Sequence, residues 1–400
     1  MIDREHSANY RVATLTEQAA HKDAEADVEY TKSEPAEPKP PWQFSYTPEL
    51  LALKANRPDF LSTDLNRATG LDWQVYQTPA FIYTGPIADA TVDQNGYVLN
   101  SAASNGFKLV RRQHRHGITP QPAHYLNVRD DAHDVVGIVK GRYRIVQNAD
   151  APRFLDHLVE SHNARYESAG LLHGGSQVWW LINLSQPISI ANDPRERIDI
   201  HLLLSSSHDG SLSTSVAVLP VRTASQTVLA WPLPGAAREM KLKLAVANGN
   251  DSEQADKVLE LAREYATELA RFGEQMVRMP FDDQQFAALL ERLLPTPKPA
   301  QSSGRIRNQR GITMAENAKG VITQIANHNR TLAAIRGTLW GGLNAIQYYA
   351  DHHTINRNTD DATTDENHFK RLTSGRTLGC QAFTYAVALV DSQPTRVRRG

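Results

Sequence analysis

The chain has 400 residues, of which 40% are hydrophobic and 22% charged, with 43 basic and 44 acidic side chains. This composition indicates a water-soluble globular protein, and a net charge of −1 means that a nucleic-acid or membrane partner has to be sought in local charge. The single cysteine, Cys380, excludes an intramolecular disulfide framework and favours a reducing compartment.

The N-terminal sequence lacks the basic start and apolar core of a secretory signal, and no apolar run approaches the roughly 18 residues that span a bilayer. We therefore expect a cytoplasmic protein with no membrane partner. Residues 1–45 are expected to form a disordered acidic arm, because residues 1–40 carry nine acidic and five basic side chains and few large apolar ones.

Residues 46–248 are expected to form a mainly antiparallel β domain with short helices. The stretch from Ser62 to Gly70 predicts a helix capped by Ser62 and stopped by Gly70. Aromatic and β-branched residues then predict strands in "LDWQVYQTPAFIY" from Leu71, "HYLNVR" from His124, "VVGIVKG" from Val135 and "YRIVQN" from Tyr143.

A helix with Asp150 as its cap is expected next, because Phe154, Leu155, Leu158 and Val159 share one helical face. Two hairpins follow, with tight turns at Gly174–Gly175 and at Asp209–Gly210. Two similar meanders in succession predict one antiparallel sheet.

Residues 249–400 are expected to form a helical region with a basic linker near 296–312. A long amphipathic helix ends at Pro280 and a shorter helix at Pro295, and further helices are expected at about 315–349 and 367–390. The buried stripe of the long helix is predicted to consist of Val258, Leu261, Ala262, Tyr265, Leu269 and Phe272. Strands first and helices after favour an α+β fold with segregated layers.

Two groups of residues raise the question of catalysis. Ser205, His208 and Asp209 have the residue types of a nucleophilic triad, but triad members usually come from separate loops and no G-x-S-x-G elbow is present. We interpret this stretch as a hairpin turn whose side chains point to opposite faces and into solvent.

Asp351, His352 and His353, together with the acids that follow them, are a possible metal site. The alternative is a solvated loop, which such runs form more often. The sequence contains no Walker loop and no G-x-G-x-x-G, so we expect no cofactor, and the chain leans towards a non-enzyme.

Two basic stretches indicate binding to phosphates. Residues 108–117 carry four bases and no acid, and residues 298–336 carry seven bases and one acid. The candidate nucleic-acid-binding residues are Lys108, Arg111, Arg112, Arg115, Arg305, Arg307, Arg310 and Lys319. The alternative is that these bases balance the acidic arm. Trp179, Trp180, Tyr143 and Tyr166 either stack on bases or fill the core.

Several blocks between residues 71 and 390, of which "YRIVQN" and "SSSHDGS" are the most specific, resemble a family of phage/plasmid-like bacterial proteins of unknown function. The chain departs from the pattern after Arg222, where Ser225 stands in place of an expected cysteine and the expected basic histidine motif is missing before the long helix. The resemblance implies a mobile-element protein. The order of elements is also similar to that of phage single-strand annealing proteins, which bind single-stranded DNA as oligomers.

The main hypothesis is therefore a non-catalytic nucleic-acid-binding protein of a phage or plasmid that binds or anneals single-stranded DNA in recombination, with homo-oligomers as a further expectation. One alternative is a protein-interaction factor that counters host defence through the acidic arm. The other is a metal-dependent nuclease that uses Asp351, His352 and His353.

Overall fold

The structure is a computed structural model that describes residues 47–83, 90–92, 98–100, 118–242, 251–298, 301–302, 305–306, 308–353, 369, 372 and 377–392, with the backbone alone at 81–83, 90–92, 98–100, 118–123, 301–302 and 305–306. The chain divides into two compact units, Met1–Lys39 and Pro40–Gly400, and all described residues belong to the second. The predicted acidic arm of residues 1–45 lies outside the described residues.

A six-stranded antiparallel sheet is the centre of the second unit. Its order is β10–β9–β8–β7–β6, and β11 also pairs with β9. The strands are β6 (Ala164–Leu172), β7 (Gln177–Ser189), β8 (Arg197–Ser207), β9 (Ser215–Arg222), β10 (Thr227–Val228) and β11 (Glu239–Lys241). Both predicted hairpins and their union in one sheet are confirmed. Gly174 and Gly210 have φ of 67° and 77° in the two turns, a conformation that glycine adopts without a steric penalty.

A separate three-stranded sheet has the order β1–β4–β5 and consists of β1 (Val75–Tyr83), β4 (Ile118–Arg129) and β5 (Val135–Lys140). Two short hairpins, β2–β3 (Ala90–Val92, Val98–Asn100) and β12–β13 (Gln301–Ser302, Arg305–Ile306), complete the described strands.

The strand predicted for "YRIVQN" is wrong, because residues 143–148 have no strand structure. Side chains hold this segment instead of a backbone ladder. The Gln147 amide accepts a hydrogen bond from the Val75 N–H (2.9 Å) and donates one to the Val75 carbonyl (2.8 Å). The Asn148 amide donates to the Leu71 carbonyl at 3.2 Å.

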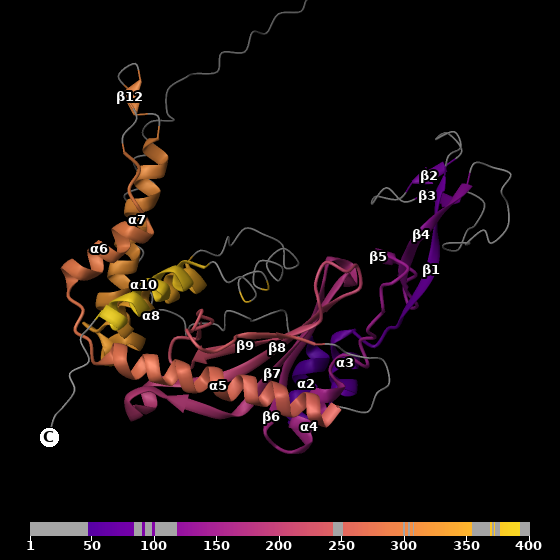
Figure 1. The fold of residues 1–400 in the computed structure, drawn as a ribbon, viewed down its shortest axis with the longest axis horizontal. Helices are drawn as coiled ribbons and strands as arrows, with labels where there is room; N and C mark the ends of the chain where they lie inside the picture. The colour runs from indigo at the N-terminus through magenta and orange to yellow at the C-terminus, as the bar shows by residue number, and fades with distance from the viewer. Residues whose placement is uncertain are drawn as a thin grey trace, which may run out of the picture. The chain divides into compact units, whose positions relative to one another are not determined.

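The described helices are α2 (Pro48–Asn56), α3 (Ser62–Thr69), α4 (Arg153–Glu160), α5 (Asp251–Val277), α6 (Asp283–Leu293), α7 (Gln309–His328), α8 (Leu339–His352) and α10 (Leu378–Ser392). Short 3₁₀ turns span His173–Gly175, Ile190–Asn192, Pro194–Glu196 and Arg330–Ile335. The long helix α5 runs along one face of the main sheet (Figure 1), and its predicted buried stripe is confirmed. In the part of the chain that the structure describes, no helix has both the length and the apolar character needed to cross a membrane.

Three details of the helices differ from the predictions. Ser62 is the first residue of α3 rather than its cap, since Leu61 occupies the N-cap position. Pro152, not Asp150, precedes α4. The helix expected over 315–349 is divided into α7 and α8 by residues 329–338. Asn329 has an extended backbone and is the C-cap of α7. It is also the N-cap of the following 3₁₀ turn, because its side chain accepts a hydrogen bond from the Thr331 N–H.

One continuous hydrophobic core unites residues from both sides of position 248, among them Trp180 and Leu202 of the sheet and Tyr265 and Trp340 of the helices. A second cluster, on the other face of the sheet, includes Trp179 and Leu203 with Phe369 and Leu372. Tyr166, Trp179 and Trp180 are therefore core residues and do not offer a ring to a ligand.

Candidate nucleic-acid interface

Three exposed cations lie within five residues at the end of strand β5, whose last residue is Lys140. We call residues 140–144, with the sequence Lys-Gly-Arg-Tyr-Arg, the basic loop. Lys140, Arg142 and Arg144 are all exposed, and no acidic residue occurs between Val135 and Asn148. Within the described residues none of the three cations forms an ion pair. Their charges are therefore available to a ligand.

Tyr143 anchors the basic loop to the main sheet. Its hydroxyl donates a hydrogen bond to the backbone carbonyl of Ser207 at the end of β8. Burial, together with the nearby Asp209 carboxylate, raises the pKa of Tyr143 to about 12, so the hydroxyl keeps its proton at neutral pH. Because Tyr143 points inward, Arg142 and Arg144 on either side of it stay at the surface.

The anchor point is the turn between β8 and β9. The Asn127 amide on β4 donates a hydrogen bond to the His208 carbonyl at 2.5 Å, and the His208 N–H donates to the Ser176 carbonyl at 2.7 Å. Gly137 on β5 lies so close that a Cβ there would be 2.4 Å from the same His208 carbonyl oxygen. One face of the three-stranded sheet is thus fastened to the hairpin turn, and the basic loop is positioned by both.

His208 is fully buried at this junction, so the expectation that it points into solvent is wrong. Its Nε2 lies 3.0 Å from Asn148 Oδ1, and its ring contacts the edge of Trp73 with 5.3 Å between centroids. Because the Asn148 amide nitrogen already donates to the Leu71 carbonyl, the Asn148 oxygen is an acceptor and His208 Nε2 carries the proton. Burial lowers the pKa of His208 to about 4, which keeps the ring neutral.

The side chains of the predicted turn do not form a nucleophile–base pair. Ser205 Oγ lies 3.5 Å from Ser215 Oγ across the β8–β9 hairpin, and His208 contacts Asn148 instead of a serine. Asp209 Oδ1 accepts a hydrogen bond from the Ser211 N–H, as a turn aspartate does. The interpretation of this stretch as a hairpin is confirmed.

The other face of the three-stranded sheet carries several exposed side chains, although Val128 and Thr78 on it are buried, and we call it the outer face. Side chains at alternate positions of β4 point to this face, namely those of residues 124, 126 and 128. On β5, Lys140 is opposite residue 124 and Ile138 is opposite residue 126. On β1, Tyr76 is opposite residue 128, so all of these side chains share a face. Tyr76 is 40% exposed, Ile138 is 50% exposed, and His124 is exposed as well. The outer face therefore combines an aromatic ring and an aliphatic side chain with the first cation of the basic loop.

The structure places the predicted binding residues in several different environments. Lys108, Arg111, Arg112, Arg115 and Arg307 lie outside the described residues, and the side chain of Arg305 in β13 does as well. Arg310 is exposed in the first turn of α7. Lys319 on the same helix forms an ion pair with Glu291 at 2.5 Å and is also bonded to Thr296, so its charge is already compensated.

The candidate metal residues at the end of α8 are engaged in hydrogen bonds. Asp351 accepts from the Val228 N–H at 2.8 Å and from the Gln347 amide at 2.9 Å, and His352 Nε2 lies 3.0 Å from the Ser225 carbonyl. Over the described residues, no three histidine, cysteine or acidic side chains come together as metal ligands would. The acids that follow His353 in the predicted metal site lie outside the described residues.

Sequence reasoning missed Lys140, Arg142 and Arg144 because it assigned their segment to strands. A signal was present in the sequence, since three cations at alternate positions surround a tyrosine in a stretch without acids. Tyr76 and Ile138 were also missed, because alternating strand residues do not show which face is covered.

Comparison with known proteins gives one match. The model of a family described as a domain of unknown function matches residues 135–373, a range that includes β5, the basic loop and the whole main sheet. No curated protein and no solved structure matches the chain.

Proposed function

Since the chain belongs to this family of the domain of unknown function DUF932, whose description assigns no activity, we propose a function from the site itself: the basic loop and the outer face bind single-stranded nucleic acid. The observation that carries the proposal is the trio of exposed cations Lys140, Arg142 and Arg144, which have no ion-pair partner among the described residues and are held in place by Tyr143.

The electrostatic part of the proposal rests on these cations. A surface ion pair satisfies both partners, whereas an unpaired cation gains when it replaces a counterion on a phosphate. Lys140, Arg142 and Arg144 lie within five residues of the chain in a stretch without acids, and the Asp209 carboxylate, which acts on Tyr143, accepts a hydrogen bond from the Ser211 N–H. The loop therefore favours a chain of phosphates over a single anion.

The preference for a single strand rests on the outer face. Exposed aromatic rings stack on unpaired bases, and duplexes hide the base faces that such rings require. Tyr76, His124 and Ile138 offer one aromatic, one imidazole and one aliphatic surface on the same side of the sheet as Lys140.

The proposal extends to the biological setting implied by the resemblance. A meander of strands followed by a long helix across the sheet is similar in element order to the phage single-strand annealing proteins. We therefore propose that the protein is encoded by a phage or plasmid, acts in the bacterial cytoplasm without catalytic chemistry, and assembles as homo-oligomers on DNA. Lys108, Arg111, Arg112 and Arg115 precede β4 in the chain and remain predicted contributors.

The test is fluorescence anisotropy with a labelled oligo-dT of about 30 nucleotides at several salt concentrations. In the triple variant Lys140→Ala, Arg142→Ala, Arg144→Ala, the slope of log affinity against log salt should become shallower by about 2, because each phosphate contact to a single strand contributes about 0.7. The variant Tyr76→Ala should lose about 1–3 kcal/mol of binding free energy with an unchanged slope, because stacking releases no counterion.

A matched control removes the same number of charges elsewhere. Lys257→Ala, Arg271→Ala, Arg278→Ala removes two exposed cations of α5 and the one that directly follows it. Each is already paired with a glutamate, so the slope should stay unchanged. Equal losses in both triple variants would show that only overall charge matters and would reject this site. Degradation of the oligonucleotide in magnesium or manganese would reject the non-catalytic part.

A further inference from the structure

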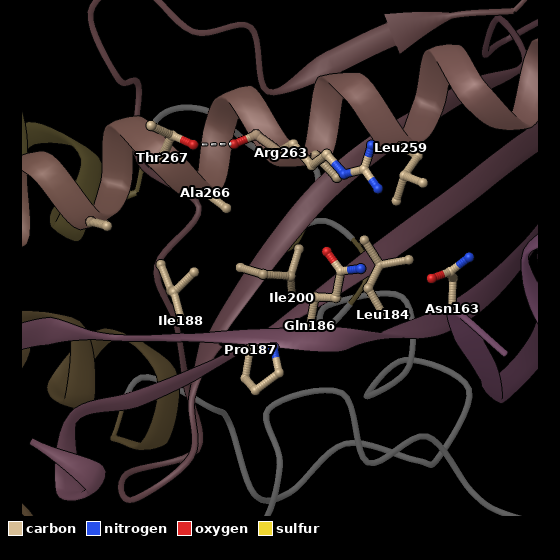
Figure 2. Close-up of a pocket in the computed structure, with 12 residues that line it drawn as sticks. Asn163, Leu184, Gln186, Pro187, Ile188, Ile200, Leu259, Arg263, Ala266 and Thr267 are labelled. Atoms are coloured by element: carbon tan, nitrogen blue, oxygen red, sulfur yellow. Dashed lines mark hydrogen bonds between the residues drawn. The ribbon is translucent and has the colours of Figure 1, made fainter. Parts of the chain in front are cut away.

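A pocket of about 390 Å³ lies between helix α5 and the strands β7 and β8 (Figure 2). Its walls are mostly apolar, and the main contributors are Leu184, Ile188, Ile200, Leu259, Ala262 and Ala266. The volume falls in the range of pockets that hold small apolar ligands or side chains.

The pocket exists because the strand bends while the helix presents short side chains. The pairing of β7 with β8 shifts between Leu184 and Ile188, so that three residues of β7 stand opposite one residue of β8. Such a bulge bends its strand away from the regular sheet. On α5, Ala262, Ala266 and Ala270 follow one another at intervals of four residues and leave the space unfilled.

A free strand edge borders this pocket. Strand β6 begins at Ala164, which pairs with Leu184, and the Ser185 N–H donates to the Asn163 carbonyl. Beyond this point, over the residues described, no strand pairs with Gln186–Ser189 on the β6 side. The backbone of a peptide in extended conformation can therefore continue the line of β6.

Helix α5 carries acids next to the pocket lining. Asp256, Glu260 and Glu264 are exposed, spaced four residues apart, and without an ion-pair partner in the described part of the chain. They do not line the pocket, but each precedes a lining residue of α5 (Leu259, Arg263 and Thr267) by three positions, which is about one helical turn. Arg263 is the cation among the pocket residues, so these four side chains have a net charge of −2. Figure 2 shows the Arg263 side chain beside Leu259 on the helix side of the pocket.

We propose that this surface binds an extended, basic peptide of a partner protein. One apolar side chain of the peptide enters the pocket, and flanking lysine or arginine residues face Asp256, Glu260 and Glu264. The peptide backbone pairs with the carbonyl groups of Gln186–Ser189 and with the N–H groups of this segment other than at Pro187, which has none. The strand edge selects an extended backbone, the pocket selects an apolar anchor, and the carboxylates select basic neighbours. The proposal does not depend on nucleic-acid binding, because it uses none of the residues of the basic loop or the outer face.

The test uses a labelled synthetic peptide, Ser-Lys-Lys-Leu-Val-Leu-Arg-Lys-Ser, in fluorescence anisotropy with the full chain. Two control peptides replace either the basic residues by glutamate or the apolar residues by serine. We expect saturable binding of the first peptide and at least about tenfold weaker binding of both controls. The double variant Glu260→Lys, Glu264→Lys should weaken binding about tenfold, because two attractions become repulsions.

Thr267→Trp places a bulky side chain at an exposed position of the pocket lining and should abolish binding while leaving the unfolding midpoint unchanged. The matched charge control is Glu239→Lys, Glu316→Lys, which reverses two exposed acids on other elements and should leave the affinity unchanged. No saturable binding up to about 1 mM peptide would overturn the proposal. Self-association of the protein that Thr267→Trp abolishes, measured by sedimentation, would overturn it in favour of a second copy as the occupant.

Discussion

Acid should destabilise the protein through His208, which the fold keeps neutral. The imidazole is fully buried against Trp73, and its Nε2 is bonded to Asn148. Its Nδ1 has no hydrogen-bond partner within the described residues, so a second proton would sit on a buried atom with nothing to accept it. Burial accordingly lowers the pKa from 6.5 to about 4.

The sign and size of the effect follow from linkage. Below pH 6.5 the His208 imidazole is protonated in the unfolded chain, whereas in the folded chain it is protonated only below about pH 4. The stabilisation is therefore complete above pH 6.5 and is lost as the pH falls towards 4. A difference of roughly 2.5 pKa units corresponds to about 3 kcal/mol in total, of which about 2 kcal/mol is lost between pH 7 and pH 5.

The assay is guanidinium unfolding, followed by tryptophan fluorescence, at half-unit intervals from pH 7.5 to pH 4.5 in the native protein and in His208→Gln. Glutamine can keep a hydrogen bond to Asn148 but does not titrate. Burial lowers the pKa of His201 as well, and this contribution is common to both proteins. The free-energy difference between them should shrink by about 2 kcal/mol from pH 7 to pH 5. Parallel pH profiles would refute the assignment of a buried neutral His208.

Two further perturbations test other buried contacts. Glu196→Ala leaves the Arg222 guanidinium buried without its carboxylate partner. In the same denaturation assay this variant should lower the unfolding free energy by about 3–5 kcal/mol. The control Arg195→Ala removes a neighbouring exposed ion pair and should have no measurable effect. Gly137→Ala places a Cβ 2.4 Å from the His208 carbonyl oxygen and should both lower the unfolding midpoint and weaken oligonucleotide binding. Gly320→Ala, in open space on α7, should do neither. Equal effects of the two variants would argue against the close approach of Gly137 to the turn.

Short sequence patterns correctly predicted the turns and helices whose formation depends only on residues that are close together in the sequence. The turn at Gly174 needs only a residue that tolerates positive φ between two β-rich runs, and α5 needs only an apolar stripe of helical period. The division of α7 from α8 was missed because apolar residues continue on both sides of it. Asn329 and Gly337 marked the break, the latter with φ of 73°, but neither interrupts the hydrophobic pattern.

The candidate site was harder to predict because its properties depend on distant residues. Charge counting found Lys319, but its partner Glu291 is 28 positions away and belongs to another helix. The burial of His208 depends on Trp73 and Asn148, which are more than 50 residues away in the sequence. Which cations are unpaired, and which polar groups are buried, is therefore a property of the tertiary structure alone.

The two proposed surfaces explain why the near-zero net charge of the chain was uninformative. Three cations without an ion-pair partner among the described residues lie together on the basic loop, and three such acids, Asp256, Glu260 and Glu264, lie on α5, so each local field survives although the totals cancel. Exposed charges are screened beyond about 8–10 Å at physiological ionic strength, so each surface selects its ligand by its own charges. The acids that would attract a basic peptide would also repel phosphates, and a nucleic acid bound at the basic loop would gain nothing by contacting α5. The opposite signs on separate elements thus agree with the two proposals, in which one chain binds two classes of ligand at different surfaces.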